Sequence, residues 1–181
     1  MTERWEIDSS HSGIHFSVRH LVVAKVRGQF ERWHATVLMD DGDPSRASVE
    51  VVIDASSLQT GVADRDAHLR SADFFDVENH PEIRFTSKQV TSAGRSQLTL
   101  VGDLTIRGVT REVELEVSDA GQMKDPWGNQ RAGFSARGSI DRNEFGLTWN
   151  KALETGGVLV GDRIEIEIDV EAVKQAPAKV A

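Results

Sequence analysis

Six histidines are the residues of this sequence best suited to chemistry, because an imidazole can bind a metal ion or carry a proton. His11 and His15 are four residues apart, but their segment has a strand-like pattern, in which that spacing separates them by about 13 Å. The other histidines stand singly in the sequence, at His20, His34, His68 and His80. We therefore predict no metal site, and the lack of cysteine excludes disulfides and thiolate catalysis.

Recognisable nucleophiles and phosphate-binding loops are also missing from the sequence. It has no Gly-x-Ser-x-Gly motif, no Ser-x-x-Lys motif and no glycine-rich loop with the lysine and serine that cradle a nucleotide. Acidic residues mostly alternate with apolar ones, which is typical of a solvated strand face. We predict no catalytic residues. One alternative stays open, in which His20 or His68 acts with a nearby carboxylate as the acid–base pair of a hydrolase or isomerase.

The composition indicates one globular domain. Of the 181 residues, 39% are apolar and 28% are charged, and 21 basic against 29 acidic residues give a net charge of −8, which disfavours nucleic acid as a partner. The first eight residues lack an apolar signal segment, which predicts a cytoplasmic protein without stable membrane insertion, or a periplasmic or secreted one if a signal was removed. We expect a single domain over 1–174 and a flexible tail over 175–181.

Apolar and polar residues alternate along most of the chain, which predicts half-buried strands. The expected strands are 13–19, 26–30, 34–39, 48–54, 83–90, 98–106, 113–117, 133–140, 145–149 and 164–170. Turn signals lie between them at 41–44, 92–94, 107–110, 125–129 and 156–157. One helix is predicted at 62–71. So many short strands with short links favour an all-β antiparallel barrel, because closure removes the exposed edges of a sheet.

Aromatic residues are spread over these predicted elements and allow two interpretations. An antiparallel barrel of eight strands is just wide enough to be filled by side chains or to hold one apolar ligand. The residues concerned are Phe16, Phe30, Trp33, Phe74, Phe75, Phe85, Phe134, Phe145 and Trp149. Their types alone do not decide between a solid core and a ligand cavity.

Several motifs resemble those of the YceI-like family. The most specific is Arg-Asp-Ala-His-Leu-Arg-Ser-Ala-Asp-Phe-Phe-Asp-Val at 65–77, and further matches lie at 11–21, 26–30, 102–110, 133–134 and 140–147. The resemblance covers about residues 3–173. It implies an extended lipocalin-like antiparallel barrel whose interior channel binds a polyisoprenoid or similar amphiphilic lipid, often as a homodimer and without catalytic residues. Members are often exported with a signal peptide, whereas this chain begins almost at its first strand.

The inward parity and the motif positions together predict two groups of ligand-binding residues. For the channel wall these are Phe16, Val18, Val26, Phe30, Phe74, Phe75, Phe85, Leu104, Ile106, Phe134, Phe145, Leu147 and Trp149. For the mouth they are His20, Arg65, Asp66 and His68, because three of them share the predicted helix. As an alternative for the mouth, Arg65 with Asp66, or Arg70 with Asp73, forms an ion pair that pins the helix to the barrel.

The expected function is non-enzymatic binding, storage or transport of a polyisoprenoid such as an isoprenoid quinone or its precursor. Polar groups at the mouth would set the specificity, because leaving them unpaired is costly. Besides a hydrolase or isomerase acting on such lipids, one further alternative is an interaction module with a filled barrel. Its candidate surface is the acidic strand with Glu165, Glu167 and Asp169.

Overall fold

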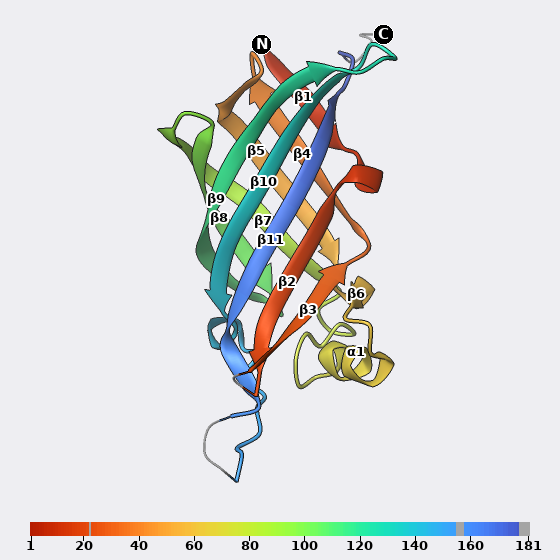
Figure 1. Ribbon diagram of the computed structural model, residues 1–181, viewed down its shortest axis with the longest axis vertical. Coiled ribbons are helices and arrows are strands. Elements are labelled where there is room, and N and C mark those ends of the chain that lie inside the picture. The colour runs from red at the N-terminus through yellow and green to blue at the C-terminus, as the bar shows by residue number, and fades with distance from the viewer. Residues whose placement is uncertain (22, 155–157, 178–181) are drawn as a thin grey trace.

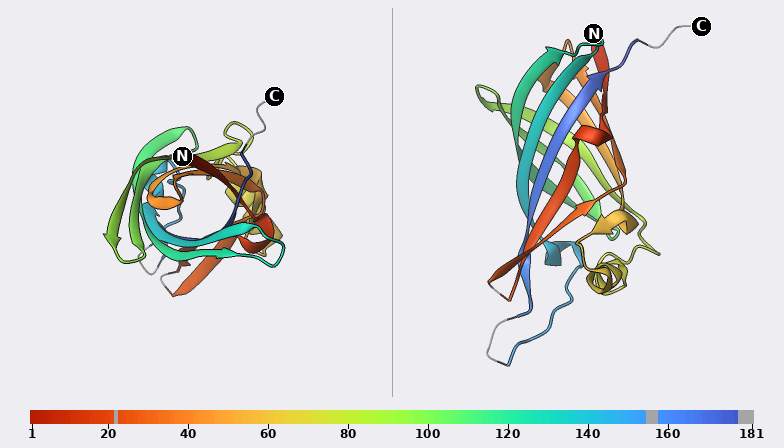
Figure 2. Two further views of the ribbon diagram at one scale, coloured as in Figure 1. Left: turned by 90° about the horizontal axis from the view of Figure 1, so that it is seen from above. Right: turned by 45° about the vertical axis from the view of Figure 1, so that its right-hand side comes forward.

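Long antiparallel strands wrap around a common axis in the computed structural model, which describes residues 1–21, 23–154 and 158–177 (Figures 1 and 2). Eight strands form the closed barrel, in the order β1 (Thr2–Ile7), β4 (Trp33–Asp40), β5 (Asp43–Asp54), β7 (Glu82–Gly94), β8 (Gln97–Ile106), β9 (Val109–Lys124), β10 (Gln130–Asp141) and β11 (Val160–Lys174). Pairing of β1 with β11 closes the circle. The predicted all-β antiparallel barrel is therefore confirmed.

Strand β11 pairs with two different segments along its length. Near its end it pairs with β1, where Trp5 lies opposite Lys174. Earlier along β11 the partner is β2 (Gly13–His20), and the short 3-10 helix η1 (Ser9–His11) lies between β1 and β2. Strand β2 continues into β3 (Ala24–Phe30), whose end pairs with β6 (Leu58–Gln59). The barrel is thus extended, at the end away from the chain termini, by a β2–β3 hairpin (Figure 1).

The one α-helix among the described residues, α1 (Ala63–Arg70), agrees with the predicted helix to within one residue at each end and lies beside the same end of the barrel (Figure 1). Hydrogen bonds to the barrel backbone fix its position. Arg70 donates from Nε to the carbonyl of Ser56 at 2.9 Å and from Nη2 to the carbonyl of Leu58 at 2.7 Å. Since Ser56 lies in the 3-10 helix η2 (Ala55–Ser57), Arg70 ties the helix to the segment leading from β5 into β6.

Residues 145–149 do not form the predicted strand, so this prediction is wrong. The Asp141 carboxylate accepts a hydrogen bond from the amide of Asn143 and starts the 3-10 helix η3 (Arg142–Phe145). Gly146 then adopts a left-handed conformation with φ of 77°, which ends the turn. Local turn chemistry therefore overrides the apolar alternation of Phe145, Leu147 and Trp149.

Further differences are the short strand β6, which was not predicted, and features near the chain ends and in one loop. Strand β1 was not predicted, although Trp5 at its centre is fully buried and β1 completes the barrel. The predicted turn at 156–157 and positions 178–181 of the predicted tail lie outside the described residues, and β11 ends at Lys174. None of the described helices is long and apolar enough to cross a lipid bilayer.

Candidate ligand-binding cavity

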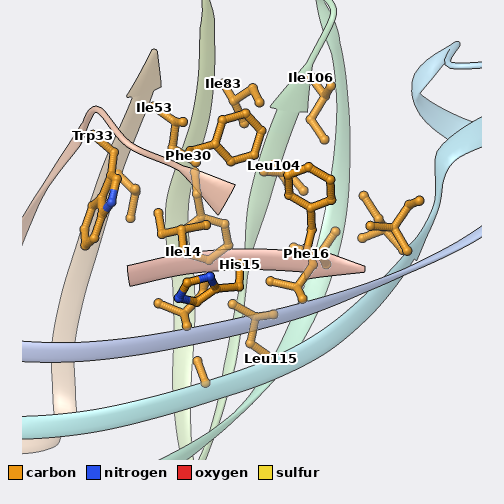
Figure 3. A pocket seen from close by; sticks show the side chains of 18 of the residues that line it. Ile14, His15, Phe16, Phe30, Trp33, Ile53, Ile83, Leu104, Ile106 and Leu115 are labelled. Carbon is orange, nitrogen blue, oxygen red and sulfur yellow. The ribbon is translucent and has the colours of Figure 1, made fainter. Parts of the chain in front are cut away.

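A cavity of about 560 Å³ lies inside the barrel, and its wall is almost entirely apolar. Figure 3 shows Ile53, Ile83 and Leu104 projecting into it from the neighbouring strands β5, β7 and β8. Phe16 and Phe30 enter from β2 and β3, with ring centroids 5.4 Å apart. The structure therefore has a hollow interior of the size that ligand pockets typically have.

The predicted wall residues line this cavity with one exception. Phe145 lies in η3, where its ring is fully buried in the surrounding core, away from the cavity. Those that line the cavity are Phe16, Val18, Val26, Phe30, Phe74, Phe75, Phe85, Leu104, Ile106, Phe134, Leu147 and Trp149. That they contact a ligand remains a prediction.

Many further residues of the same inward parity complete the wall. Apart from Trp33, the examples below come from the predicted strands, so the alternation that located those strands also contained the signal for these positions. Examples from the wall are Ile14, Trp33, Val51, Ile53, Ile83, Leu98, Leu100, Leu115, Val117, Ile164, Ile166, Ile168 and Val170. The small side chains Ala35, Ala47 and Ala136 also line the cavity and fill little of the interior.

Inward-facing glycines give the large wall side chains room to lie along the sheet. Gly28 lies between the wall residues of β3, and the Phe16 ring covers it from β2. Gly102 occupies the equivalent place on β8, where an added Cβ would come within 2.5 Å of the Phe85 ring. Any larger residue at these positions would push the ring into the cavity. Glycine here therefore helps to keep the interior open.

An aromatic cluster lies at the α1 end of the cavity. His68 on α1 meets Trp149 edge to face, with ring centroids 4.6 Å apart, and meets Phe74 at 5.1 Å. All three side chains line the cavity. His68 also forms a hydrogen bond through Nε2 to the Asp73 carboxylate at 2.8 Å. A polar pair thus adjoins the largely apolar cavity at this end.

Of the predicted mouth residues, His20, Arg65 and His68 line the cavity, but Asp66 does not. Asp66 is buried, and its carboxylate accepts hydrogen bonds from the Thr60 amide and hydroxyl. Arg65 donates to the same residue, from Nε to Oγ1 at 2.8 Å and from Nη2 to the carbonyl at 2.9 Å. Asp66 therefore holds α1 against the segment that precedes it. The sequence motif alone does not distinguish this anchoring role from contact with a ligand.

Neither of the two ion pairs considered for pinning the helix forms. Arg65 and Asp66 both bind Thr60, as described, and Arg70 donates to backbone carbonyls. Asp73 pairs with His68 instead. The helix is indeed pinned to the barrel, but by hydrogen bonds to the backbone and to Thr60.

Arg142 is a wall residue that the sequence motifs did not single out. Its side chain is 4% exposed, and it donates hydrogen bonds to the carbonyls of Leu147 at 2.6 Å, Trp149 at 2.8 Å and Gly161 at 2.8 Å. Burial lowers the pKa of the guanidinium. Since these carbonyls belong to two chain segments, Arg142 joins the Trp149 segment to the start of β11.

One group with metal-like spacing occurs on the outside of the barrel. Ligand atoms of Asp8, His11 and Glu171 lie within 4.8 Å of one another. The guanidinium of Arg131 already pairs with both carboxylates of this group, donating from Nη1 to Asp8 at 2.9 Å and to Glu171 at 2.5 Å. His11 lies in η1, although its segment has a strand-like pattern, and its hydrogen bond to Asp8 raises its pKa. The group is therefore an ion-pair network that fastens the segment after β1 to β10 and β11.

Comparison with known proteins gives matches over nearly the whole chain. The YceI-like domain family matches residues 5–172. A UPF0312 protein of Staphylococcus aureus is 38% identical over 165 residues, covering 91% of this chain and 94% of its own. The YceI protein of Campylobacter jejuni superposes with a TM-score of 0.77 at 29% identity, covering 87% of this chain and 90% of its own.

A more distant structure shares the fold. A polyisoprenoid-binding domain of Saccharophagus degradans superposes with a TM-score of 0.67 at 12% identity, covering 94% of this chain and 98% of its own. The family match spans every barrel strand from the centre of β1 to near the end of β11. The chain therefore belongs to the YceI-like family.

Proposed function

We propose that the cavity binds a polyisoprenoid or similar amphiphilic lipid, such as an isoprenoid quinone or its precursor. The protein would store or transport this lipid without converting it. The observation that carries the proposal is the apolar interior of about 560 Å³ with polar side chains gathered at the α1 end. A fold shared with a polyisoprenoid-binding domain supports the same class of ligand.

The cavity volume suits a chain of about four isoprene units. At roughly 30 Å³ for each carbon-sized group, 560 Å³ holds about 19 carbons. Burying them at ~0.8 kcal/mol each contributes about 15 kcal/mol before costs. Micromolar affinity needs about 8 kcal/mol, so roughly 7 kcal/mol remains to offset the ordering of the chain and the loss of its free motion. A longer chain would extend out of the mouth.

The mouth residues would recognise the polar head of the lipid. Within the described residues, the His68 ring forms its hydrogen bond through Nε2 to Asp73, which leaves Nδ1 to accept a hydrogen bond from a hydroxyl group. Arg65 is held by Thr60 and presents a permanent positive charge to the same end of the cavity. His20 lines the cavity from β2.

The pair of His68 and Asp73 also favours a second candidate function. A histidine oriented by a carboxylate beside a lipid cavity has the arrangement of a general acid–base pair, as a hydrolase or isomerase would need. Turnover of a labelled prenyl lipid that disappears in His68→Ala would support this candidate. Lipid that is recovered unchanged from both proteins supports simple binding.

The protein-interaction alternative has weaker support. Glu165 pairs with Arg163 at 2.7 Å, and Asp169 accepts a hydrogen bond from Ser135 at 2.7 Å. These acids are therefore partly satisfied by their own sheet. The cavity also argues against the filled barrel on which that alternative was based.

Native mass spectrometry of protein purified from its own host tests the proposed function. A prenyl lipid bound in stoichiometric amount, and released by organic extraction, is the expected result. A bare protein that takes up no added prenyl lipid would overturn the proposal. The same spectra report whether the homodimer implied by the family resemblance forms.

A further inference from the structure

The β2–β3 hairpin carries positive charge without acidic partners. Residues 9–30 contain no aspartate or glutamate, although the whole chain has 29. Arg19 lies directly opposite Lys25 on the two strands, and both side chains are exposed. Facing like charges destabilise a strand pair, and within the described residues neither cation forms a salt bridge. An anion outside the protein would therefore be attracted to this hairpin.

The nearest acids of β11 are already engaged with other cations. Asp162 lies 3.7 Å from the guanidinium of Arg142, and Glu165 pairs with Arg163 at 2.7 Å. The protein as a whole is negatively charged, so the positive charge of this hairpin is opposite in sign to the net charge of the chain.

Exposed apolar side chains lie between these cations. Leu21 is 44% exposed and Val23 is 86% exposed, and both lie beyond the strand ends of the hairpin. Leu21 adopts a left-handed backbone with φ of 54°, a conformation that glycine or asparagine would take at lower cost. A large apolar residue thus occupies an exposed and conformationally unfavourable position.

A second loop adds to the same surface. The amide of Leu21 donates to the carbonyl of Leu159 at 3.0 Å, which places the two loops side by side. Val158 beside it is 45% exposed, and the amide of Leu159 donates to the carbonyl of Lys151, another exposed cation. The described parts of both loops project past the barrel at the end that carries α1 (Figure 2, right).

This projecting surface adjoins the cavity. His20 and Val26 of the hairpin line the cavity, and so do Leu159 of the second loop and Val160 at the start of β11. An apolar ligand leaving the cavity here would meet the exposed apolar side chains first. A bilayer is the natural source of such a ligand, because transfer through water would expose the chain at a cost that grows with each methylene.

We propose that this end of the barrel docks on the surface of an anionic lipid bilayer and so opens the cavity towards the membrane. The hairpin surface consists of Arg19, Leu21, Val23, Lys25, Lys151 and Val158. Cations that flank apolar side chains match the boundary between lipid headgroups and acyl chains, whereas an acidic protein or nucleic acid would leave the apolar side chains unused. The proposal rests on the proposed function for the reason why the protein docks, which is lipid exchange. Binding to the bilayer itself does not require a lipid in the cavity.

Vesicle co-sedimentation tests the proposal. The wild-type protein is expected to bind vesicles of one part phosphatidylglycerol to two parts phosphatidylcholine, and to bind pure phosphatidylcholine vesicles much more weakly. Lys25→Gln and Lys151→Gln should each weaken binding about fivefold at low salt, and the double variant about 25-fold. Leu21→Ser with Val23→Ser should weaken binding to both kinds of vesicle.

Trp127→Ser is the matched control, since Trp127 is 81% exposed in the β9–β10 turn near the opposite end of the barrel. Vesicle binding should be unchanged in this variant. Absence of binding by the wild-type protein, or equal loss in Trp127→Ser, would overturn the proposal. Salt-sensitive capture of an acidic protein or nucleic acid without vesicle binding would overturn it too.

Uptake of a prenyl lipid from detergent micelles separates the two proposals. The hairpin variants replace exposed residues outside the cavity wall, so their uptake from micelles should equal that of the wild type. If vesicle binding fails while uptake from micelles persists, docking is wrong and the proposed function stands. If uptake from micelles fails in the wild type, the proposed function is wrong whatever the vesicles show.

Discussion

Replacing Ala136 by phenylalanine should shorten the cavity without unfolding the barrel. Ala136 lines the cavity from β10, between Val117 of β9 and Ile168 of β11. The substitution adds six carbons to a wall that faces empty space. At roughly 30 Å³ per carbon-sized group these occupy about 180 Å³, or about a third of the 560 Å³ present.

The expected effect depends on the length of the ligand. A twenty-carbon prenyl alcohol needs the whole cavity, so it loses room for about six carbons. At ~0.8 kcal/mol for each, its affinity falls by about 5 kcal/mol, or by three to four powers of ten. A ten-carbon alcohol needs about 300 Å³, which fits in the roughly 380 Å³ that remain, so its affinity should change little.

Competition binding with the two alcohols measures this difference. Arg137→Phe is the control, because Arg137 is the next residue on the same strand and its side chain is exposed on the outer face. It should leave both affinities unchanged. An equal loss for both alcohols in Ala136→Phe, or no loss for either, would refute the argument that the interior volume sets the length of chain bound.

Three further predictions concern the wall, the buried arginine and the acid stability. Phe134→Asp places a carboxylate in the apolar wall and should weaken lipid uptake at least a hundredfold while lowering the thermal unfolding temperature less than a core substitution, because Phe134 faces the cavity. Arg142→Met removes the donor shared by three carbonyls and should lower the free energy of unfolding in urea by about 3 kcal/mol. Arg131, hydrogen-bonded to the Asp125 carboxylate, lowers the pKa of Asp125 to about 2 from an ordinary 3.8. The stabilisation from this carboxylate is present above pH 4 and is lost as the pH falls towards 2, so Asp125→Asn should flatten the acid side of the stability profile.

The wall and acid-stability predictions each have a contrasting variant. Phe145→Ala should do the reverse of Phe134→Asp, costing about 3–5 kcal/mol of stability with little direct effect on uptake, since Phe145 is buried outside the cavity. Equal losses of folding and uptake in Phe134→Asp would argue for a solid core there. Stability unchanged in Arg142→Met would contradict the bridging role of Arg142. An acid profile in Asp125→Asn that matches both the wild type and the exposed variant Glu116→Gln would contradict the assignment to Asp125.

Most of the barrel was predictable because its strands have one face in the interior and one in water. In such strands apolar and polar residues alternate, as in 164–170. The same alternation places the apolar residues on the cavity wall. The helix was equally visible, since 62–71 has early acids and a late arginine. The wall could thus be predicted by parity, one strand at a time.

Apart from the missed strand β1, the failures occur where a side chain acts on the backbone. Asp141 starts a turn within a segment that has strand-like alternation, and Asp66 anchors α1 while sitting in a motif that suggests ligand contact. Arg142 is recognisable as important only once the carbonyls around it converge in three dimensions. Whether the interior was hollow also depended on packing between strands, as in the ring of Phe85 lying over Gly102.

The double pairing of β11 has a consequence for how the protein is made. Because β11 joins β10 to both β1 and β2, the two ends of the chain must meet before the ring of strands is complete. On the ribosome, the apolar inner faces of β1 to β10 therefore remain open to water until the last strand has emerged. Such distant pairing is slow, because the entropy of closing a long loop is lost before the contacts form. The lumen is thus the last feature to appear during folding, and removal of residues 160–174 should leave an open, aggregation-prone sheet rather than a smaller barrel.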